Sequence, residues 1–186
     1  MYNSIYYYID KFNIDEISKL NRFISIIFRD YSNKLSEKEM TTMVRFCKKQ
    51  RRKVYISNNL KFALKFNFDG IYIPSFNKIL KYKNIYKKKF EIIGSAHNTM
   101  EIKNKEAQGC TKIFLCPIFK TKKAKNFLGV TKFNLIKLNT KREVVSLGGI
   151  NKNNIKKVSL CSIKAVAGIS WIKKNGPSIN TGPFLK

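Results

Sequence analysis

Ile92-Ile93-Gly94-Ser95-Ala96-His97 is an apolar run that ends on polar side chains. Six further runs have the same form and close on a short polar or glycine-containing segment: Ile26–Tyr31, Val54–Asn59, Asp69–Pro74, Ile113–Pro117, Val144–Gly149 and Ala165–Ser170. Continuous apolar runs are typical of strands in a parallel sheet that helices cover on both faces. The pattern therefore predicts an α/β fold with its polar segments gathered at the carboxyl ends of the strands.

Helix signals separate these strands. Ser36 followed by Glu39 resembles a capping box, and Asn98 followed by Glu101 opens a second helix in the same way. Asn59 is suited to cap a third, short helix. The residues that this third helix would carry toward the core are Leu60, Ala63 and Leu64.

The candidate strands lie at about residues 4–9, 23–29, 53–57, 70–73, 90–95, 112–117, 143–148 and 165–170. The first of them, Ser4–Ile9, could equally be an edge element or an N-terminal latch. Alternation of strands and helices predicts a small single-domain (β/α)8 TIM barrel over residues 1–186. Because such barrels usually have about 200 residues or more, some helices should be short. Their active sites lie at the carboxyl ends of the strands.

The composition is strongly basic, with 38 Lys and Arg against 11 Asp and Glu and a formal net charge of +27. Such a charge attracts nucleic acid, anionic membranes or phosphorylated small molecules. However, the lysines are spread along the chain and accompany many Asn, Ile, Tyr and Phe residues, a mixture that AT-rich coding also produces. We favour a background charge that helps to capture an anionic substrate. A basic nucleic-acid-binding protein is the alternative from another class.

The four cysteines, at positions 47, 110, 116 and 161, have no CxxC spacing and do not cluster with the single histidine. Buried, reduced thiols are therefore expected. The chain has no apolar run of about 18 residues, and Tyr6-Tyr7-Tyr8 has no basic leader before it. These features predict a cytoplasmic protein without a membrane segment, and they leave its oligomeric state open.

Glycines follow the last two candidate strands, as Gly148-Gly149 and as Gly168-Ile169-Ser170. Glycine allows backbone N–H groups to approach an anion closely, and the loops after strands seven and eight of a barrel often bind phosphate. A tight turn from strand to helix would explain either glycine segment alone. Together they predict a phosphate cup.

Basic residues follow two other strands. Arg29 ends the second strand, where its guanidinium is suited to bidentate phosphate binding, although an ion pair with Asp30 or a carboxylate at a helix end is an equal alternative. Thr121 lies with Lys123 and Lys125 after the sixth strand. This segment is suited to close over a pyrophosphate, and a solvated run of charges is the simpler alternative.

His97 is the single histidine and lies two residues after Ser95, just before a candidate helix. The position suits a general acid or base, or a contact to a phosphate or a substrate ring. A structural role is the alternative.

Together these segments resemble the thiamine phosphate synthase/TenI family of small β/α barrels, over about residues 22–172. The stretches that carry the resemblance are Asn59–Pro74 (NLKFALKFNFDGIYIP), Ile93–Glu101 (IGSAHNTME), Phe114–Gly129 (FLCPIFKTKKAKNFLG), Ser146–Ile150 (SLGGI) and Val166–Ile172 (VAGISWI).

The resemblance implies an enzyme of thiamine biosynthesis. Thiamine phosphate synthases are transferases that join hydroxymethylpyrimidine pyrophosphate to thiazole phosphate, with Mg²⁺ helping the pyrophosphate to depart. TenI-like members are thiazole tautomerases. The resemblance favours a synthase, with a TenI-like tautomerase or a diverged, non-coupling thiazole-phosphate-binding relative as the alternative.

Several residues match the family's site. Arg29 corresponds to the pyrophosphate-binding arginine, Ser95 to the serine after strand five and Thr121 to the threonine of the loop after strand six. Lys123 and Lys125 flank Ala124, which stands where the family has its loop lysine. The residues that correspond to the thiazole-phosphate cup are Gly148, Gly149, Ile169 and Ser170.

The sequence also departs from the family's pattern. Asn58 and Asn77 stand where the family has its two magnesium-binding aspartates. Ile27 and Tyr31 replace a glutamine and a lysine around the strand-two arginine. Exchanging two carboxylates for amides removes most of the attraction for a hard dication. A magnesium-assisted mechanism is therefore in doubt, unless the substrate's own pyrophosphate supplies most of the metal's ligands.

Overall fold

The computed structural model describes residues 4–29, 35–85, 89–122 and 124–175. Eight parallel strands form a closed barrel in which each strand pairs with the next along the chain, and the last pairs with the first. Their bounds are β1 Ser4–Ile9, β2 Ile24–Phe28, β3 Val54–Ser57, β4 Gly70–Ile73, β5 Glu91–Ala96, β6 Lys112–Leu115, β7 Glu143–Leu147 and β8 Ala165–Gly168. The predicted (β/α)8 TIM barrel is confirmed.

The aromatic first run is a full strand of the barrel. In β1, Ile5 pairs with Ile24 of β2 on one side and with Val166 of β8 on the other. The alternatives of an edge element or an N-terminal latch are therefore wrong. Parallel closure places the residues that follow all eight strands at one end of the barrel.

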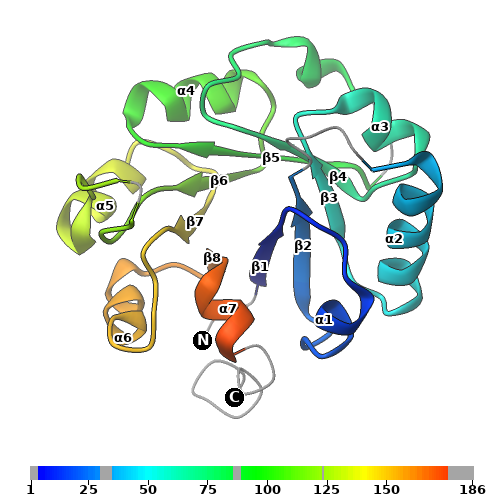
Figure 1. The fold of residues 1–186 in the computed structure, drawn as a ribbon. Helices are drawn as coiled ribbons and strands as arrows, with labels where there is room; N and C mark the ends of the chain where they lie inside the picture. The colour runs from blue at the N-terminus through cyan, green and yellow to red at the C-terminus, as the bar shows by residue number, and fades with distance from the viewer. Residues whose placement is uncertain (1–3, 30–34, 86–88, 123, 176–186) are drawn as a thin grey trace.

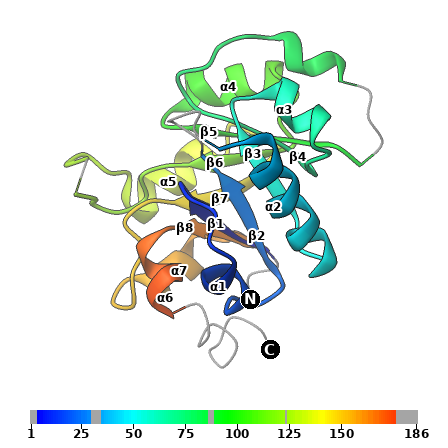
Figure 2. The same cartoon turned by 45° about the vertical axis from the view of Figure 1, so that its right-hand side comes forward.

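Helices surround the strands, and in both views α2 and α3 lie on the side opposite α5 and α6 (Figures 1 and 2). Their bounds are α1 Ile14–Ser18, α2 Glu37–Lys49, α3 Leu60–Lys65, α4 Thr99–Ala107, α5 Gly129–Lys137, α6 Ile155–Val158 and α7 Ser170–Asn175, with 3₁₀ turns η1 at Lys81–Asn84 and η2 at Ser159–Cys161. None of the helices in the described residues is long and apolar enough to cross a membrane.

The predicted helix starts are confirmed by their caps. Ser36 and Glu39 form a reciprocal capping box at the start of α2, and Asn98 accepts a hydrogen bond from the main-chain N–H of Glu101 at the start of α4. Asn59 caps α3 in the same way. One detail was wrong, because Leu64 of α3 is 42% exposed and does not face the core.

Aromatic side chains fill the inside of the barrel. Tyr6, Tyr8, Tyr55, Tyr72 and Phe114 belong to one buried cluster, distinct from the larger apolar layer between strands and helices. Edge-to-face contacts hold this cluster, with ring centroids 5.0 Å apart for Tyr6 and Phe114 and 5.4 Å for Tyr8 and Tyr72. The barrel is therefore a packed core, and a ligand has to bind at an end of it.

Candidate active site at the carboxyl ends of the strands

Arg29 leaves the end of β2 and is held by the end of β1. Its Nε lies 3.0 Å from Oδ1 of Asp10 and its Nη2 lies 3.3 Å from Oδ2, while the guanidinium lies 5.0 Å from the centre of the Tyr8 ring. Asp10 is a carboxylate partner that the sequence reasoning did not name, since it considered Asp30 or a carboxylate at a helix end, and Asp30 lies outside the described residues. The fork and the ring fix the orientation of the cation at the barrel mouth.

Asn58 and Asn77 meet after β3 and β4. Asn77 Nδ2 donates to Asn58 Oδ1 at 2.5 Å and to the Tyr82 hydroxyl at 2.9 Å, and Asn77 Oδ1 accepts the main-chain N–H of Ile79 at 2.9 Å. Asn77 is buried, while Asn58 is exposed and has a φ of 58°, a conformation that asparagine tolerates. Two positions 19 residues apart in the sequence are thus in direct contact.

These two amides do not fit as the protein's ligands for Mg²⁺. Such a dication prefers charged carboxylate oxygens. Neither asparagine carries a charge, and each side-chain oxygen already accepts a hydrogen bond from this same loop. The two amides therefore lack the donor chemistry that the resemblance assigns to these positions.

His97 bridges the ends of three strands. It follows β5, its Nδ1 lies 2.7 Å from the main-chain oxygen of Cys116 beyond β6, and its Nε2 lies 3.1 Å from Oγ of Ser75 beyond β4. Because a carbonyl oxygen only accepts, this network assigns the proton to Nδ1, and Nε2 of the neutral ring then accepts from Ser75. The ring is thus held in one tautomer while the residue is exposed.

Cys116 and Ser95 are the buried side chains considered beside this histidine. The Cys116 sulfur lies 3.6 Å from His97 Nδ1, but burial raises the pKa of this thiol to about 12 and keeps it protonated. Ser95, at the end of β5, is also buried. The thiol is therefore not an acid–base group here, and the exposed imidazole is the side chain of this cluster whose geometry suits proton transfer.

Gly148 and Gly149 follow β7 with φ values of 95° and 73°. A Cβ atom at Gly149 would lie 2.4 Å from the main-chain oxygen of Phe119, and one at Gly148 would lie 2.8 Å from Cβ of Pro117. The glycines are required here because the loop after β6 packs directly on this turn. Their part in a phosphate cup remains a prediction.

The loop after β6 contains the predicted basic residues. Thr121 closes a turn within it, since its Oγ1 accepts the N–H of Ala124 at 2.9 Å and its own N–H donates to the oxygen of Ala124 at 3.2 Å. Lys125 is exposed. Lys123 lies outside the described residues. The loop thus lies against the glycine turn after β7, and no described contact tests the lysine roles.

The last predicted segment lies at the end of β8. Gly168 is the final residue of that strand, Ile169 is 41% exposed, and the exposed Ser170 begins α7. A Cβ at Gly168 would meet the Ile172 side chain at 3.6 Å, an ordinary contact. Space therefore does not require glycine at this position.

Sequence reasoning missed Asp10 and Ser75. Asp10 holds Arg29 and directly follows β1, and Ser75 contacts His97 and lies two residues after the end of β4. Polar residues just after barrel strands are candidates for the site, and both Asp10 after β1 and Ser75 after Pro74 meet this criterion. Conversely, Ile27 lies in the apolar interior of the barrel, so the family's glutamine has no polar equivalent at this position.

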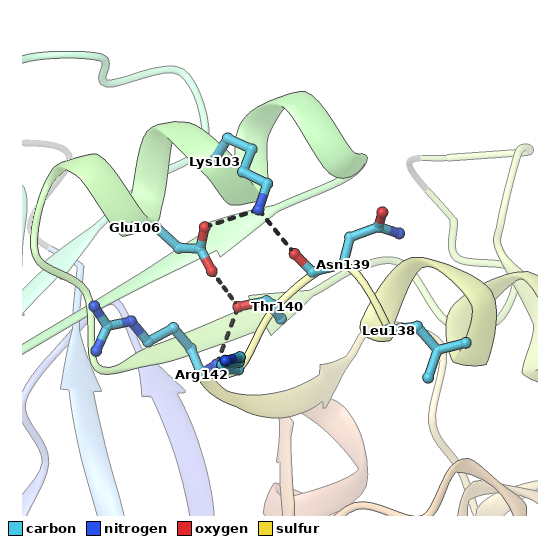
Figure 3. A pocket seen from close by; sticks show the side chains of 7 residues that line it. Lys103, Glu106, Leu138, Asn139, Thr140 and Arg142 are labelled. Carbon is cyan, nitrogen blue, oxygen red and sulfur yellow. Dashed lines mark hydrogen bonds and ion pairs between the residues drawn. The ribbon is translucent and has the colours of Figure 1, made fainter.

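A groove of about 700 Å³ lies at the opposite end of the barrel, between α4 and the segment before β7 (Figure 3). Glu106 accepts hydrogen bonds from Lys103 and from the Thr140 hydroxyl, and Lys103 also donates to the oxygen of Asn139. These contacts join α4 to the loop after α5. The groove contains none of the predicted site residues.

The fold is a (β/α)8 barrel that carries a cation, two amides, an imidazole and glycine turns at the carboxyl ends of its strands. The family model described as thiamine monophosphate synthase matches residues 19–172. The chain belongs to this family.

Individual relatives agree with this assignment. A thiamine-phosphate synthase of Prochlorococcus marinus is 35% identical over 144 residues, which cover 72% of this chain and 40% of that protein. One of Methanococcus vannielii is 30% identical over 122 residues, covering 63% of this chain and 58% of that protein. The chain thus spans about 40% of the length of the Prochlorococcus relative.

Solved structures show the same fold. A thiamine phosphate pyrophosphorylase from Pyrococcus furiosus superposes with a TM-score of 0.78 at 18% identity, covering 96% of this chain and 94% of that chain. One from Bacteroides thetaiotaomicron has a TM-score of 0.65 at 15% identity, covering 100% of this chain and 89% of that chain.

Proposed function

We propose that the chain is a thiamine phosphate synthase-like transferase that joins hydroxymethylpyrimidine pyrophosphate to thiazole phosphate and releases pyrophosphate. Family membership and the names of the relatives support this reaction. The observation that carries the proposal is the orientation of Arg29 at the barrel mouth, where Asp10 and the Tyr8 ring fix its guanidinium. A rigid, bidentate donor is what a departing pyrophosphate requires.

In this reaction the C–O bond between the pyrimidine methylene and pyrophosphate breaks, and the electron pair leaves with the pyrophosphate. The thiazole nitrogen donates its lone pair to the same carbon and forms the new C–N bond. Arg29 would stabilise the negative charge that develops on the leaving group. Asp10 is the more exposed partner of the pair, with 59% side-chain exposure against 19% for Arg29, so the substrate would compete with a solvated carboxylate.

The other residues would form two groups, one for each substrate. Thr121, Gly148 and Gly149, with Ile169 and Ser170, would bind the thiazole phosphate, and Lys123 and Lys125 would lie over the pyrophosphate. Asn58, Asn77, Ser95 and Gly168 would line the site, the two asparagines on the pyrimidine pyrophosphate side. Mg²⁺ would then enter on the substrate's pyrophosphate, since the asparagines do not fit as its ligands.

The proposal is tested by incubating the purified chain with both substrates and measuring thiamine phosphate and pyrophosphate. Equal amounts of the two products, formed in proportion to enzyme concentration, are expected. Binding of thiazole phosphate without formation of thiamine phosphate would contradict the proposal and leave a non-coupling relative.

A TenI-like tautomerase is the second candidate, and the fixed His97 ring favours it. An imidazole held by Cys116 O and Ser75 is suited to move a proton on a thiazole phosphate carboxylate. For this function, His97→Asn should lower the rate by about 100-fold or more and remove a histidine-like pH dependence. A rate and pH profile unchanged by the substitution would exclude the tautomerase role.

The proposal also covers the setting of the enzyme. The described cysteines are free and buried, which supports a reducing, cytoplasmic location. The barrel would be one domain over residues 1–186, acting on small phosphorylated molecules and not on specific nucleic acid sequences. If so, any association with DNA should be weak and lost steeply with salt.

A further inference from the structure

Lys105 of α4 is a cation that is completely buried, with an exposed fraction of 0%. Its Nζ donates to the main-chain oxygens of Pro74 and Asn77 at 2.7 and 2.8 Å and to Oε1 of Gln108 at 2.8 Å. All three ammonium donors are therefore matched. No carboxylate takes part in these hydrogen bonds.

Gln108 extends the same network. It is also 0% exposed, and its Nε2 donates to the main-chain oxygens of Asn77 and Ile79 at 2.8 and 3.0 Å. Lys105 and Gln108 together thus bind three carbonyls of the segment Pro74–Ile79, between β4 and η1. We call this pair of side chains the α4 clamp.

Burial of an ammonium group is costly, and an aliphatic side chain would fill the same space without that cost. The surroundings accommodate the lysine specifically. A Cβ at Gly94 of β5 would lie 2.9 Å from Cδ of Lys105, so the stem of the lysine crosses the strand where no side chain stands. What the lysine provides is a set of donors for the Pro74–Ile79 segment.

This segment carries two of the contacts that order the candidate site. Asn77 binds Asn58 with its side chain, and Ser75 contacts Nε2 of His97. Both residues lie in the stretch that the α4 clamp holds from behind. Displacement of the segment would therefore move both the Asn77 amide and the Ser75 hydroxyl at the mouth of the barrel.

We propose that Lys105, assisted by Gln108, is a positioning residue for the pyrimidine pyrophosphate side of the site, because it fixes the segment that carries Ser75 and Asn77. This inference rests on the proposed function. The glycine turns after β7 and β8 do not contact the α4 clamp in any described hydrogen bond, so the thiazole phosphate side should be insensitive to it.

The test compares Lys105→Met with Lys103→Met. Lys103 lies two residues away on α4 and bonds to Glu106 and Asn139 at the other end of the barrel, so it is a matched control. Lys105→Met should raise the KM for pyrimidine pyrophosphate by about 10-fold with the KM for thiazole phosphate unchanged. Lys103→Met should change neither value.

Hydrogen exchange gives an independent readout. Lys105→Met should speed exchange of the Asn77 and Ile79 amides by about 10-fold or more, with α4 itself unchanged. If Lys105→Met does not fold, Gln108→Glu keeps an acceptor for Lys105 and removes both Nε2 donors, and a smaller change in the same direction is expected. Faster exchange with both KM values unchanged would overturn the positioning role.

The proposed function can fail separately from this inference. Calorimetric titration with inorganic pyrophosphate measures the site without turnover. If the unmodified chain binds pyrophosphate but forms no thiamine phosphate, the synthase proposal fails, and weaker pyrophosphate binding in Lys105→Met alone would still support the positioning role. Equal affinity in both lysine variants, or no binding by the unmodified chain, would overturn it.

Discussion

Arg52 and Lys105 are both buried cations that bind main-chain carbonyls, but they act at opposite ends of the barrel. Arg52 is 2% exposed, and its guanidinium donates to the oxygens of Ile17, Leu20, Asn21 and Ile24, which connect α1 to the start of β2. Lys105 binds the segment after the end of β4. The same chemistry fixes a strand start in one case and a site-bearing loop in the other, so a buried cation has to be interpreted by what it holds.

The largest expected effect is on stability at the amino end. Arg52→Met leaves four main-chain carbonyls without their donor, and we expect the free energy of unfolding to fall by about 3 kcal/mol or more. Urea denaturation followed by circular dichroism measures this loss. The KM values of the folded Arg52→Met enzyme for both substrates should equal those of the unmodified chain. A selective rise in one KM would show that the amino end of the barrel influences the site at the carboxyl end.

The next effect is on activity at the carboxyl end. Arg29→Ala removes the oriented guanidinium, and we expect kcat/KM for coupling to fall by about 100-fold, or 2.7 kcal/mol. Asp10→Asn keeps the cation and serves as the control, with a smaller loss expected. If His97→Asn reduces coupling more than Arg29→Ala does, proton transfer and not pyrophosphate departure limits the reaction.

A smaller effect is expected where the two asparagines meet. Asn58→Asp with Asn77→Asp restores two carboxylates, and we expect the Mg²⁺ concentration needed for half-maximal coupling to fall by about 10-fold, or 1.4 kcal/mol. The double Asn→Ala variant controls for lost hydrogen bonds. High coupling activity of the unmodified chain at low Mg²⁺ would show that the two amides do not weaken the use of Mg²⁺ by the site.

The smallest expected effect is a dependence of stability on pH. Burial lowers the pKa of Lys105 to about 8, whereas an unfolded lysine titrates near 10.5. Between these values the unfolded chain binds more protons, so stability should rise with pH, by about 1 kcal/mol from pH 8 to pH 9. Thermal or urea unfolding of the unmodified chain and of Lys105→Met measures this difference, which should be absent if folded Lys105 stays protonated over this pH range, as an unfolded lysine does.

Local sequence signals predicted the fold because several independent ones point to the same alternation of strands and helices. The apolar runs, the capping pairs such as Ser36 and Glu39, and the glycines of the β7 turn all correspond to observed strands, caps and tight contacts. Parallel closure then placed the strand ends together. The barrel, and the position of the candidate residues at the carboxyl ends of its strands, were therefore accessible from the sequence.

The partners of the site residues were not accessible in the same way. Asp10 pairs with Arg29 because β1 and β2 are neighbours, and Ser75 reaches His97 across β4 and β5, contacts that depend on three-dimensional register. In the sequence Lys105 is one of several lysines on a polar helix. Its burial against the loop after β4 could not be predicted, because a nine-residue helix with few apolar residues has no clear hydrophobic periodicity.

Backbone NMR of the labelled chain, titrated with inorganic pyrophosphate and then with thiazole phosphate, tests the division between the two ends most directly. The largest amide shift changes are expected at Arg29, around His97 and at Gly148, Gly149 and Ser170. Changes at Ile24, Asn139 and Arg142 should stay at background level. Largest changes in the groove beside Lys103 and Arg142, with the strand ends unaffected, would contradict it.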